Sequence, residues 1–237
     1  MQQHKRILLK LSGEALLGKQ KFGIDTGVLN DIADQVNLLQ AHNIEIGIVI
    51  GGGNIFRGVE SKSFNIDRAT ADYMGMLATV INALALQGVL AKKGTDVRVM
   101  SSLSLTQVAE PYILTKALSH LRKKRVVIFA GGTGLPFFTT DTTAALRAIE
   151  TKADALFKAT KVDAIYSADP LKDKNARKYT SISYTEFLAK DLKAMDSTAI
   201  SLCREYKMPI ILFNIKKKGN LVRAVLKGDI GTYIKGG

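Results

Sequence analysis

Three glycine-rich turns carry the strongest chemical signal in this sequence. Each follows a short apolar run, which is typical of a buried parallel strand, and each leads toward a helix. The strands and their turns are residues 6–11 with Ser12, Gly13 and Glu14, residues 46–50 with Gly51, Gly52 and Gly53, and residues 126–130 with Gly131, Gly132, Thr133 and Gly134. Because backbone N–H groups at such turns bind anionic oxygens, the pattern indicates a site that handles phosphate groups.

Lys10 lies at the carboxyl end of the first of these strands. In open α/β sheets ligands bind at this edge, so its ammonium group is expected to face the anionic site. A lysine there stabilises negative charge on a transferring phosphoryl group, which is mainly an electrostatic task. For Lys10 taken alone, a surface lysine that ends a strand is the alternative, and the neighbouring glycine turns favour the functional interpretation.

The second and third turns continue into residues that suit a nucleotide. Three consecutive glycines leave no side chain between backbone and ligand, and Arg57 then offers a planar fork of donors, although a plain tight turn is the alternative. After the third turn, an extended segment with Phe137 and Phe138 supplies an apolar wall. Asp141 is predicted to cap the next helix, and it also has the chemistry to orient Lys10 or a metal ion. Asp72, expected just before a long helix, has the same ambiguity.

Other catalytic signatures are absent from the sequence. It contains no P-loop, no dinucleotide-binding fingerprint and no protein-kinase motifs. Its three histidines lie at the N-terminus or at predicted helix ends, and no zinc-type or Ser/His/Asp arrangement stands out. The expected chemistry is therefore positioning and charge stabilisation, without a covalent intermediate.

Strand and helix patterns alternate along the chain, which predicts a three-layer α/β/α fold with a mostly parallel central sheet. We expect one domain over residues 1–237, with a soft boundary between lobes near residues 149–155. Residues 160–183 are expected to form a loop-rich region. The other predicted helices span residues 26–42 (with Thr26 as N-cap), 74–91, 111–122, 144–153, 184–190, 196–206 and 221–226, and the other strands span residues 96–100, 155–159, 210–213 and 231–234.

Composition narrows the class of protein. The single cysteine, Cys203, fits a reducing compartment and a small core residue rather than a nucleophile. Residues 74–91 are almost uncharged, but their two amide side chains favour a core or subunit-interface helix over a membrane span. We therefore expect an intracellular, cytoplasmic protein. A net charge of +13 suits capture of phosphorylated substrates, and a nucleic-acid-binding regulator is supported by charge alone.

Four segments resemble the amino acid kinase superfamily, and within it the bacterial uridylate (UMP) kinases. They are K-L-S-G-E-A-L from Lys10, V-I-G-G-G-N-I-F-R-G from Val49, G-T-G-L-P-F-F-T-T-D from Gly132 and K-A-T-K-V-D-A-I-Y-S-A-D-P from Lys158. The likeness covers residues 5 to 234. It implies an amino acid kinase-like fold and transfer of the γ-phosphoryl group of ATP to UMP, with Mg²⁺, giving UDP and ADP in pyrimidine biosynthesis. A relative that phosphorylates a carboxylate or carbamate is the alternative, which the T-T-D loop disfavours.

The resemblance also implies roles for individual residues, with residues 1–150 on the UMP side and residues 151–237 on the ATP side. Catalysis falls to Lys10, to Asp141 as the acid that organises this lysine, and to Asp196, which has a charge-balancing or magnesium-linked role. The ATP-binding residues are Lys10, Leu11, Ser12, Gly13, Gly53, Arg57, Thr160, Tyr166 and Asp169. The UMP-binding residues are Gly52, Asp72 as the ribose-binding acid, Thr133, Gly134, Leu135, Pro136, Phe137, Phe138, Thr139 and Thr140.

Assembly and regulation follow from the same resemblance. It implies a homohexamer, inhibition by UTP and activation by GTP, with magnesium held mainly by the ATP phosphates rather than by identified protein ligands. Neither a membrane nor a dedicated nucleic-acid partner is expected. The segment aligned with the GTP response is Gly18, Lys19, Gln20, Lys21, Phe22 and Gly23.

Overall fold

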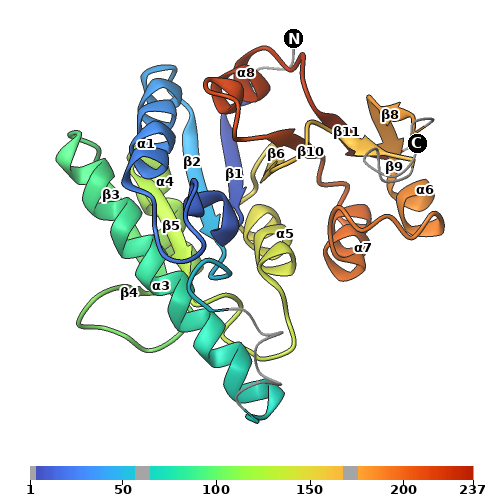
Figure 1. Cartoon of the computed structure of the whole chain (residues 1–237). Helices are drawn as coiled ribbons and strands as arrows, with labels where there is room; N and C mark the ends of the chain where they lie inside the picture. Colours follow the sequence, from blue (N-terminus) through green and yellow to red (C-terminus); the bar gives the residue numbers. More distant parts are fainter. Residues whose placement is uncertain (1–3, 57–64, 168–175, 237) are drawn as a thin grey trace.

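The computed structural model describes residues 4–56, 65–167 and 176–236, and a single large sheet forms its centre (Figure 1). Within these residues the sheet has nine strands, and every neighbouring pair runs parallel except β10 with β11. A separate antiparallel pair joins β7 (Ile165–Tyr166) to β8 (Lys178–Tyr179). The order across the sheet is β4 (Glu110–Pro111), β3 (Val97–Ser101), β5 (Val126–Ala130), β2 (Glu45–Ile50), β1 (Arg6–Leu11), β6 (Ala155–Thr160), β10 (Ile210–Asn214), β11 (Thr232–Lys235) and β9 (Ser181–Ser183).

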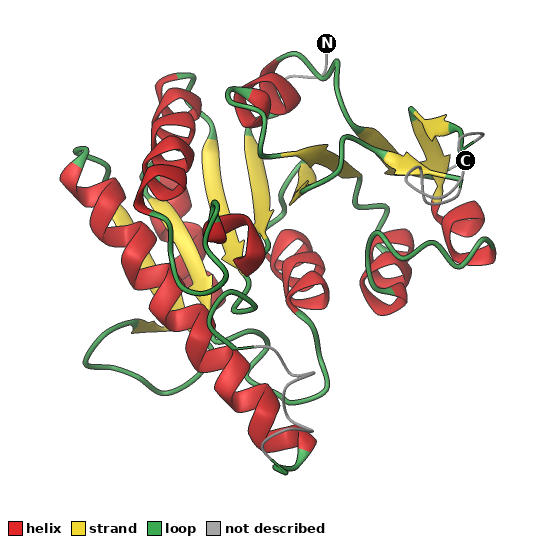
Figure 2. Ribbon diagram, viewed as in Figure 1, coloured by secondary structure: helices red, strands yellow, loops and turns green. Residues whose placement is uncertain are grey.

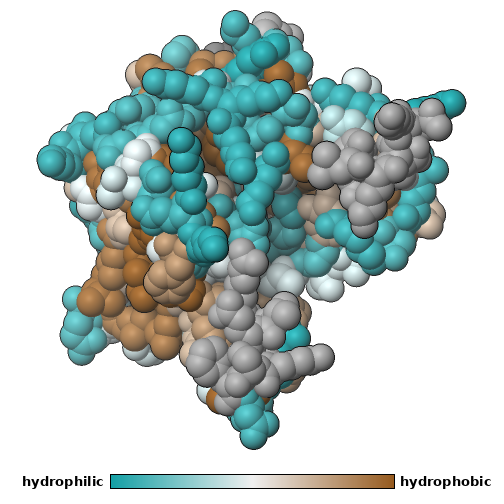
Figure 3. Space-filling model, viewed as in Figure 1, coloured by the Kyte–Doolittle hydropathy of each residue, from teal (hydrophilic) through white to brown (hydrophobic). Residues whose placement is uncertain are grey.

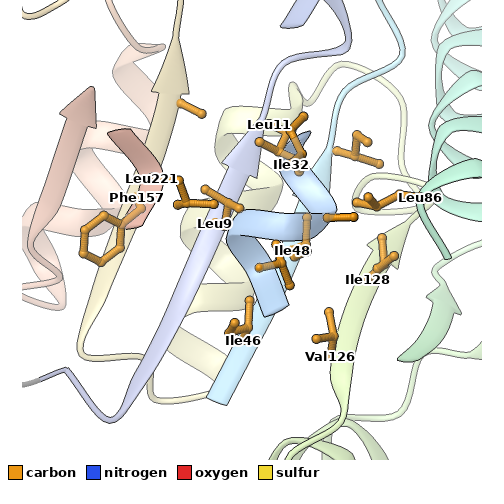
Figure 4. Close-up of a cluster of buried hydrophobic side chains, with 14 of the residues drawn as sticks. Leu9, Leu11, Ile32, Ile46, Ile48, Leu86, Val126, Ile128, Phe157 and Leu221 are labelled. Carbon is orange, nitrogen blue, oxygen red and sulfur yellow. The ribbon is translucent and has the colours of Figure 1, made fainter. Parts of the chain in front are cut away.

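Helices cover both faces of the sheet, so the predicted three-layer α/β/α arrangement is confirmed (Figure 2). On one face, Ile32 of α1, Leu86 of α3 and Leu221 of α8 join strand residues such as Leu9 in one apolar cluster (Figure 4). On the other face, Ala144 of α5 and other helix residues pack on the opposite sides of the same strands. The helices are α1 (Thr26–Ala41), α3 (Arg68–Lys92) and α8 (Asn220–Leu226) on the first face, and α4 (Leu114–Arg122), α5 (Thr140–Glu150), α6 (Tyr184–Ala189) and α7 (Ser197–Glu205) on the second.

Four predicted helix starts were wrong. Helix α4 begins at Leu114 rather than at residue 111, because Pro111 belongs to β4. In the other three cases a polar residue nearer the N-terminus captures the first free N–H groups. Asp25, not Thr26, caps α1 by accepting from the N–H of Val28 (3.0 Å). Asp67 caps α3, so Asp72 lies inside this helix rather than before it. Thr139 caps α5, which places Asp141 in the first turn instead of at the cap.

Two loop expectations also need correction. Residues 136 and 137 form a turn rather than an extended segment, and Phe137 has a left-handed backbone with φ of 70°. The region expected to be loop-rich contains the short strands β7, β8 and β9. These strands have two or three residues each, too few for an alternating pattern to stand out in the sequence.

The helix α3 is apolar on two faces. By length and composition it could cross a membrane, and 44% of its most apolar window is buried inside the molecule. Its buried side packs on the sheet through Val80 and Leu86, as in a core helix of a globular protein. The opposite side leaves an apolar stripe exposed, which is visible over the middle of the helix in Figure 3. This α3 stripe consists of Tyr73, Met74, Leu77 and Ile81.

Candidate active site

Alternation of side chains along two neighbouring strands brings two lysines together. In β1, Leu9 and Leu11 face the α1 side of the sheet, so Lys10 faces α5. In β6, Phe157 faces the α1 side and Lys158 faces α5. The register pairs Lys10 with Lys158 directly across the two parallel strands. Both lysines are almost fully buried, with 7% and 8% of their surface exposed.

Asp141 lies between these two ammonium groups. Its Oδ1 is 2.8 Å from Lys10 Nζ, and its Oδ2 accepts a hydrogen bond from Lys158 Nζ. The carboxylate reaches both lysines because it lies in the first turn of α5, directly above the carboxyl ends of β1 and β6. One carboxylate therefore fixes the position of two cations.

Burial and the neighbouring charge of opposite sign act in opposite directions on the pKa of Asp141 and on that of Lys158. Burial pulls the pKa of Asp141 upward, but the positive charges of Lys10 and Lys158 outweigh burial and lower that pKa to about 2. Burial lowers the pKa of Lys158 below the usual lysine range, and the attraction of Asp141 opposes that shift only in part. Asp141 is consequently ionised at neutral pH, and Lys158 gives up its proton more readily than an exposed lysine does.

Asp196 completes the polar cluster from the start of α7. It caps this helix by accepting from the N–H of Ala199 (2.7 Å). Its other contacts are with the first turn of α5, where it accepts hydrogen bonds from the hydroxyls of Thr139 and Thr142. Asp196 thus ties two helix N-termini together beside the lysines, and its negative charge favours the charged form of Lys158.

The first and second glycine turns are in close contact. A Cβ atom on Gly13 would lie 2.6 Å from the backbone nitrogen of Gly53 and 2.8 Å from the carbonyl oxygen of Gly51. No side chain larger than that of glycine fits at position 13 without displacing the second turn. Ser12 and Gly13 lie where β1 passes into the short 3-10 helix η1 (Gly13–Leu17), so the Leu11–Gly13 backbone borders the same edge of the sheet.

A cavity of about 130 Å³ opens between the second and third turns and the N-terminal half of α3. Several residues predicted to bind UMP lie around it. By contrast, Thr133, Gly134, Leu135, Pro136 and Phe137, which belong to the adjoining turn, and Thr139, which caps α5, do not line the cavity. Its lining is Gly52, Gly53, Phe56, Ala71, Asp72, Gly75, Met76, Thr79, Gly132, Phe138 and Thr140.

Asp72 connects this cavity to the third turn. Its Oδ2 accepts from the backbone N–H of Phe137 (2.7 Å), and its Oδ1 pairs with Arg68 (2.8 Å) one helical turn away. The hydrogen bond holds the Phe137 backbone in its left-handed conformation against α3. Asp72 therefore both lines the cavity and positions the adjoining segment around Phe137.

A second cavity, of about 370 Å³, is lined by Asp141 together with residues of α6, of α7 and of the segment between these helices. Asp141 and Asp196 lie on its wall together with the polar residues Asp191, Lys193 and Ser197, and Phe187, Leu188 and Leu192 contribute apolar surface. Asp141, which pairs with both lysines, lines this cavity, and the neighbouring Thr140 lines the first one, so both cavities reach the first turn of α5. The two cavities provide room for a donor and an acceptor near one set of charges.

The segment predicted to hold the adenine nucleotide continues from β6. The Thr160 hydroxyl donates to the carbonyl oxygen of Val162 (2.8 Å), and Tyr166 lies in β7. Val162 is half exposed. The predicted site residues Arg57 and Asp169 lie outside the described residues.

The predicted effector segment is tied to the second turn. Gly23 N–H donates to the carbonyl oxygen of Asn54 (2.9 Å), and Asn54 Nδ2 donates to the carbonyl oxygen of Gly23 (2.9 Å). Gly18 ends η1, and Phe22 is exposed between these two anchor points. The segment Gly18, Lys19, Gln20, Lys21, Phe22 and Gly23 therefore forms a loop that borders the glycine turn.

Sequence reasoning missed Lys158, although this residue begins one of the motifs quoted above. Its signal was the alternation in the run 155–160, which places a lysine between buried apolar residues on the same face as Lys10. A lysine is almost never fully buried unless it is paired, so its position implied a nearby carboxylate. The reasoning also missed Thr79 and Asn82, two buried polar residues of α3.

The fold and this cluster can be compared with known proteins. The amino acid kinase family model matches residues 5–214. UMP kinase from Bacillus anthracis has 41% sequence identity and a TM-score of 0.96, covering 99% of this chain and 97% of its own. UMP kinase from Ureaplasma parvum has 36% identity and a TM-score of 0.92, covering 99% and 100%. Uridylate kinase from Archaeoglobus fulgidus has 26% identity and a TM-score of 0.76, covering 96% and 99%.

Coverage by the family model extends over most of the sequence, and the two bacterial structures match it from end to end. The chain therefore belongs to the amino acid kinase family, and within it to the UMP kinases.

Proposed function

We propose that this protein transfers the γ-phosphoryl group of ATP to UMP, giving UDP and ADP in pyrimidine nucleotide biosynthesis. Its membership of the UMP kinases supports this function. One structural observation carries the proposal, namely that Asp141 holds Lys10 and Lys158 together and itself lines one cavity, while the adjacent Thr140 lines the other. A phosphoryl group in transit carries negative charge on three oxygens, and two fixed ammonium groups stabilise that charge.

Asp141 acts in this proposal as an orienting group and not as a general base. With a pKa of about 2, its carboxylate is too weak a base to accept a proton efficiently near neutral pH. UMP needs no such base, because its phosphate oxygens are already ionised and nucleophilic at that pH. An oxygen of the UMP phosphate attacks the γ-phosphorus, the bond from phosphorus to the bridging oxygen breaks, and ADP leaves with the electron pair.

UMP occupies the cavity lined by Gly52, Asp72 and Phe138. The Asp72 carboxylate accepts hydrogen bonds from ribose hydroxyls, and Phe138 contributes apolar surface next to the base. The segment from Thr133 to Thr140, which leads from the third turn into α5, covers the nucleotide. Asp72 also accepts a hydrogen bond from the Phe137 N–H, so the residue that binds the ribose holds the covering segment as well.

ATP approaches from the side of β6 and α7. Lys10, Leu11, Ser12, Gly13 and Gly53 contact its phosphates through the lysine side chain and the backbone of the two touching turns. Thr160 and Tyr166 flank the adenosine. Arg57 and Asp169 complete this set in the proposal, and both lie outside the described residues.

Mg²⁺ accompanies ATP in this proposal. Within residues 4–56, 65–167 and 176–236, no three His, Cys, Asp or Glu side chains are grouped to hold a metal ion. In this proposal the magnesium ion is held mainly by nucleotide phosphates and water, next to Asp196, which is one of the carboxylates on the wall of the 370 Å³ cavity. When bound, the ion neutralises phosphate charge, while the lysines and glycine turns orient the reacting groups.

A homohexamer with UTP as inhibitor and GTP as activator is part of the same proposal. The α3 stripe offers an apolar surface for contact between subunits. The loop from Gly18 to Gly23 is positioned to report an effector, because it is hydrogen-bonded to Asn54 beside the second turn. The cytoplasm is the proposed location, and burial raises the pKa of the lone Cys203 thiol to about 12, which keeps it unreactive.

An acceptor panel tests the proposed function. ADP release is measured with ATP and Mg²⁺ in the presence of UMP, CMP, carbamate, aspartate or acetylglutamate. We expect the highest kcat/KM with UMP and little ADP release with the amino acids. Turnover with aspartate, acetylglutamate or carbamate, but not with UMP, would overturn the assignment.

A further inference from the structure

We infer that Thr79 and Asn82 of α3 are positioning residues that fix the second and third glycine turns at the distance the reaction needs. This inference rests on the proposed function and concerns residues that act through the turns and not on the reacting atoms. Thr79 also lines the 130 Å³ cavity, but its hydroxyl is bonded to Met76 and Gly131. Both side chains are buried, with 2% of Thr79 and 0% of Asn82 exposed. They lie three residues apart and so project from the same face of the helix.

Asn82 holds the second turn. Its Nδ2 donates to the carbonyl oxygen of Gly51 (2.7 Å) and to Oδ1 of Asn54 (2.7 Å). Its Oδ1 accepts from Asn54 Nδ2 (3.0 Å). The two amides thus exchange hydrogen bonds in a buried setting, and both hydrogens of the Asn82 amide group are used.

Thr79 holds the third turn. Its Oγ1 donates to the carbonyl oxygen of Met76 (2.6 Å), three residues earlier in the helix, and accepts from the backbone N–H of Gly131 (2.8 Å). Because the hydroxyl group donates its proton to the Met76 carbonyl, a lone pair on Oγ1 remains to accept from the Gly131 N–H. This glycine has φ of 74°, a conformation that side chains rarely allow, so its N–H direction is specific to the turn.

Close packing supports the same role for α3. A Cβ atom on Gly52 would lie 2.6 Å from the carbonyl oxygen of Gly75 and 2.8 Å from the Cβ of Ala78. The second turn is therefore seated directly on the helix. Asp72 binds the third turn farther along α3, through the Phe137 N–H. Four contacts thus follow one another along α3, made by Asp72, by Gly75 with Ala78, by Thr79 and by Asn82. Together they set the spacing between the second turn, which borders both nucleotides, and the third turn with the segment after it, which covers UMP.

The two residues are expected to affect the substrates differently. Gly131 belongs to the UMP side alone, whereas the Gly51–Gly53 turn borders both nucleotides. A buried N–H or carbonyl group left without a partner shifts toward water and takes its turn with it. Loss of the Thr79 hydroxyl should therefore weaken UMP use selectively, and loss of the Asn82 amide should weaken the use of both nucleotides.

The sharpest test compares Thr79→Val with Thr79→Ser. Valine matches the shape of threonine without the hydroxyl, and serine retains the hydroxyl. We expect Thr79→Val to raise the KM for UMP on the order of tenfold, while the KM for ATP changes by less than about twofold. Thr79→Ser should restore the KM for UMP. An equal rise in both KM values, or a serine variant no better than valine, would overturn the role of Thr79.

Asn82→Leu is the second variant, and Gln35→Leu is its matched control. Like Asn82, Gln35 is a buried amide that is hydrogen-bonded to the backbone, since its side-chain oxygen accepts from the N–H of Leu221 (3.0 Å). Gln35 lies on α1 and lines neither cavity. Both substitutions should lower the melting temperature. Only Asn82→Leu should also raise both KM values, and a control that raises them equally would contradict a positioning role for Asn82.

Wild-type turnover with UMP separates this inference from the proposed function. If the wild-type chain does not phosphorylate UMP, the proposed function fails and the inference fails with it. If the wild-type chain is active but Thr79→Val changes stability without altering the KM for UMP, the inference alone is refuted. The serine and valine pair remains decisive even if Asn82→Leu does not fold.

Discussion

Asp141 is shared between two lysines, and this sharing explains why a buried pair of cations is tolerated at the site. A lone buried ammonium group loses its hydration without compensation, and a second one nearby adds repulsion. The carboxylate offsets both costs and keeps each ammonium group aimed at the edge of the sheet. Because the two lysines lower the pKa of Asp141 to about 2, the ionised carboxylate stabilises the fold at neutral pH. This contribution to stability is lost as pH falls toward about 2.

Lys158 should determine the alkaline limit of activity. Burial lowers its pKa, so its positive charge disappears at a lower pH than that of an exposed lysine, and turnover should fall as pH rises through that value. Arginine keeps its charge throughout this range. We expect Lys158→Arg to move the alkaline limb of the kcat profile to higher pH, and Lys158→Met to lower kcat about 100-fold at pH 7. An alkaline limb that stays unchanged in Lys158→Arg would assign it to another group.

Asp72 should distinguish the two nucleotides. Asn at this position keeps the shape and an acceptor oxygen but loses the charge that strengthens hydrogen bonds to ribose and to the Phe137 N–H. We expect Asp72→Asn to raise the KM for UMP about tenfold, with a much smaller effect on the KM for ATP. Steady-state kinetics with each substrate varied in turn give this comparison. An equal change in the two KM values would argue against ribose binding.

The site residues also show which features the sequence predicts and which it does not. Lys10, Asp72 and Asp141 were predicted to be functional; in the structure Asp72 lines one cavity, Asp141 lines the other, and Lys10 pairs with Asp141. Their contacts depend on which residues start the helices, and that choice was wrong for α1, α3 and α5. Capping is a competition between several neighbouring polar residues, as Thr139 and Asp141 illustrate, and it is decided by the direction in which the chain enters the helix.

At the scale of elements, the strands were easier to predict than the helices. The core strands β1, β2, β5 and β6 are continuous apolar runs covered on both faces, so their positions agree with prediction to within a residue. The short strands β7 and β8 depend on pairing with each other, which no local pattern reveals. Lys158 was missed for a related reason, because its partner lies on a different element.

The packing of the second turn on α3 gives an element-scale prediction. Gly52→Ala would place a Cβ atom within 2.8 Å of both Gly75 and Ala78, so the turn must move away from the helix. We expect a loss of turnover with UMP of at least about tenfold and a lower melting temperature. Gly88→Ala on α3 is the control, because a Cβ atom added at Gly88 meets nothing within 4 Å.

Gly88→Ala should keep full activity and raise stability by up to about 1 kcal/mol, because alanine favours a helix more than glycine does. Thermal unfolding and steady-state kinetics of both variants provide the measurements. If Gly52→Ala behaved like Gly88→Ala, the second turn would not depend on its seat against α3.

At the scale of the molecule, the two predicted lobes map onto the two halves of one sheet. Strands β1 to β5 come from residues 1–150 and occupy one half, and β6, β9, β10 and β11 from residues 151–237 occupy the other. The boundary falls between β1 and β6, where Lys10 faces Lys158. The proposed acceptor and donor sides therefore meet at the two lysines, which is where transfer between them requires positive charge.

The α3 stripe gives a prediction about assembly. Leu77 and Ile81 are 45% and 51% exposed, which is unusual for adjacent turns of one apolar helix in a monomer. We expect the double variant Leu77→Lys, Ile81→Lys to elute as a smaller species in size-exclusion chromatography with light scattering. Leu38→Lys on α1, where the leucine is 53% exposed, is the control and should leave the assembly intact. A wild-type chain that is already monomeric would contradict the proposed hexamer.

The most direct test of the central claim is the rate of UDP formation from ATP and UMP by the wild-type chain and by Lys10→Ala. In Lys10→Ala, Asp141 still pairs with Lys158, so circular dichroism should show an intact fold. We predict equal amounts of UDP and ADP from the wild-type chain, and a kcat lower by about 100-fold to 1,000-fold in the variant. A folded variant that forms UDP at the wild-type rate would contradict phosphoryl transfer stabilised by this lysine.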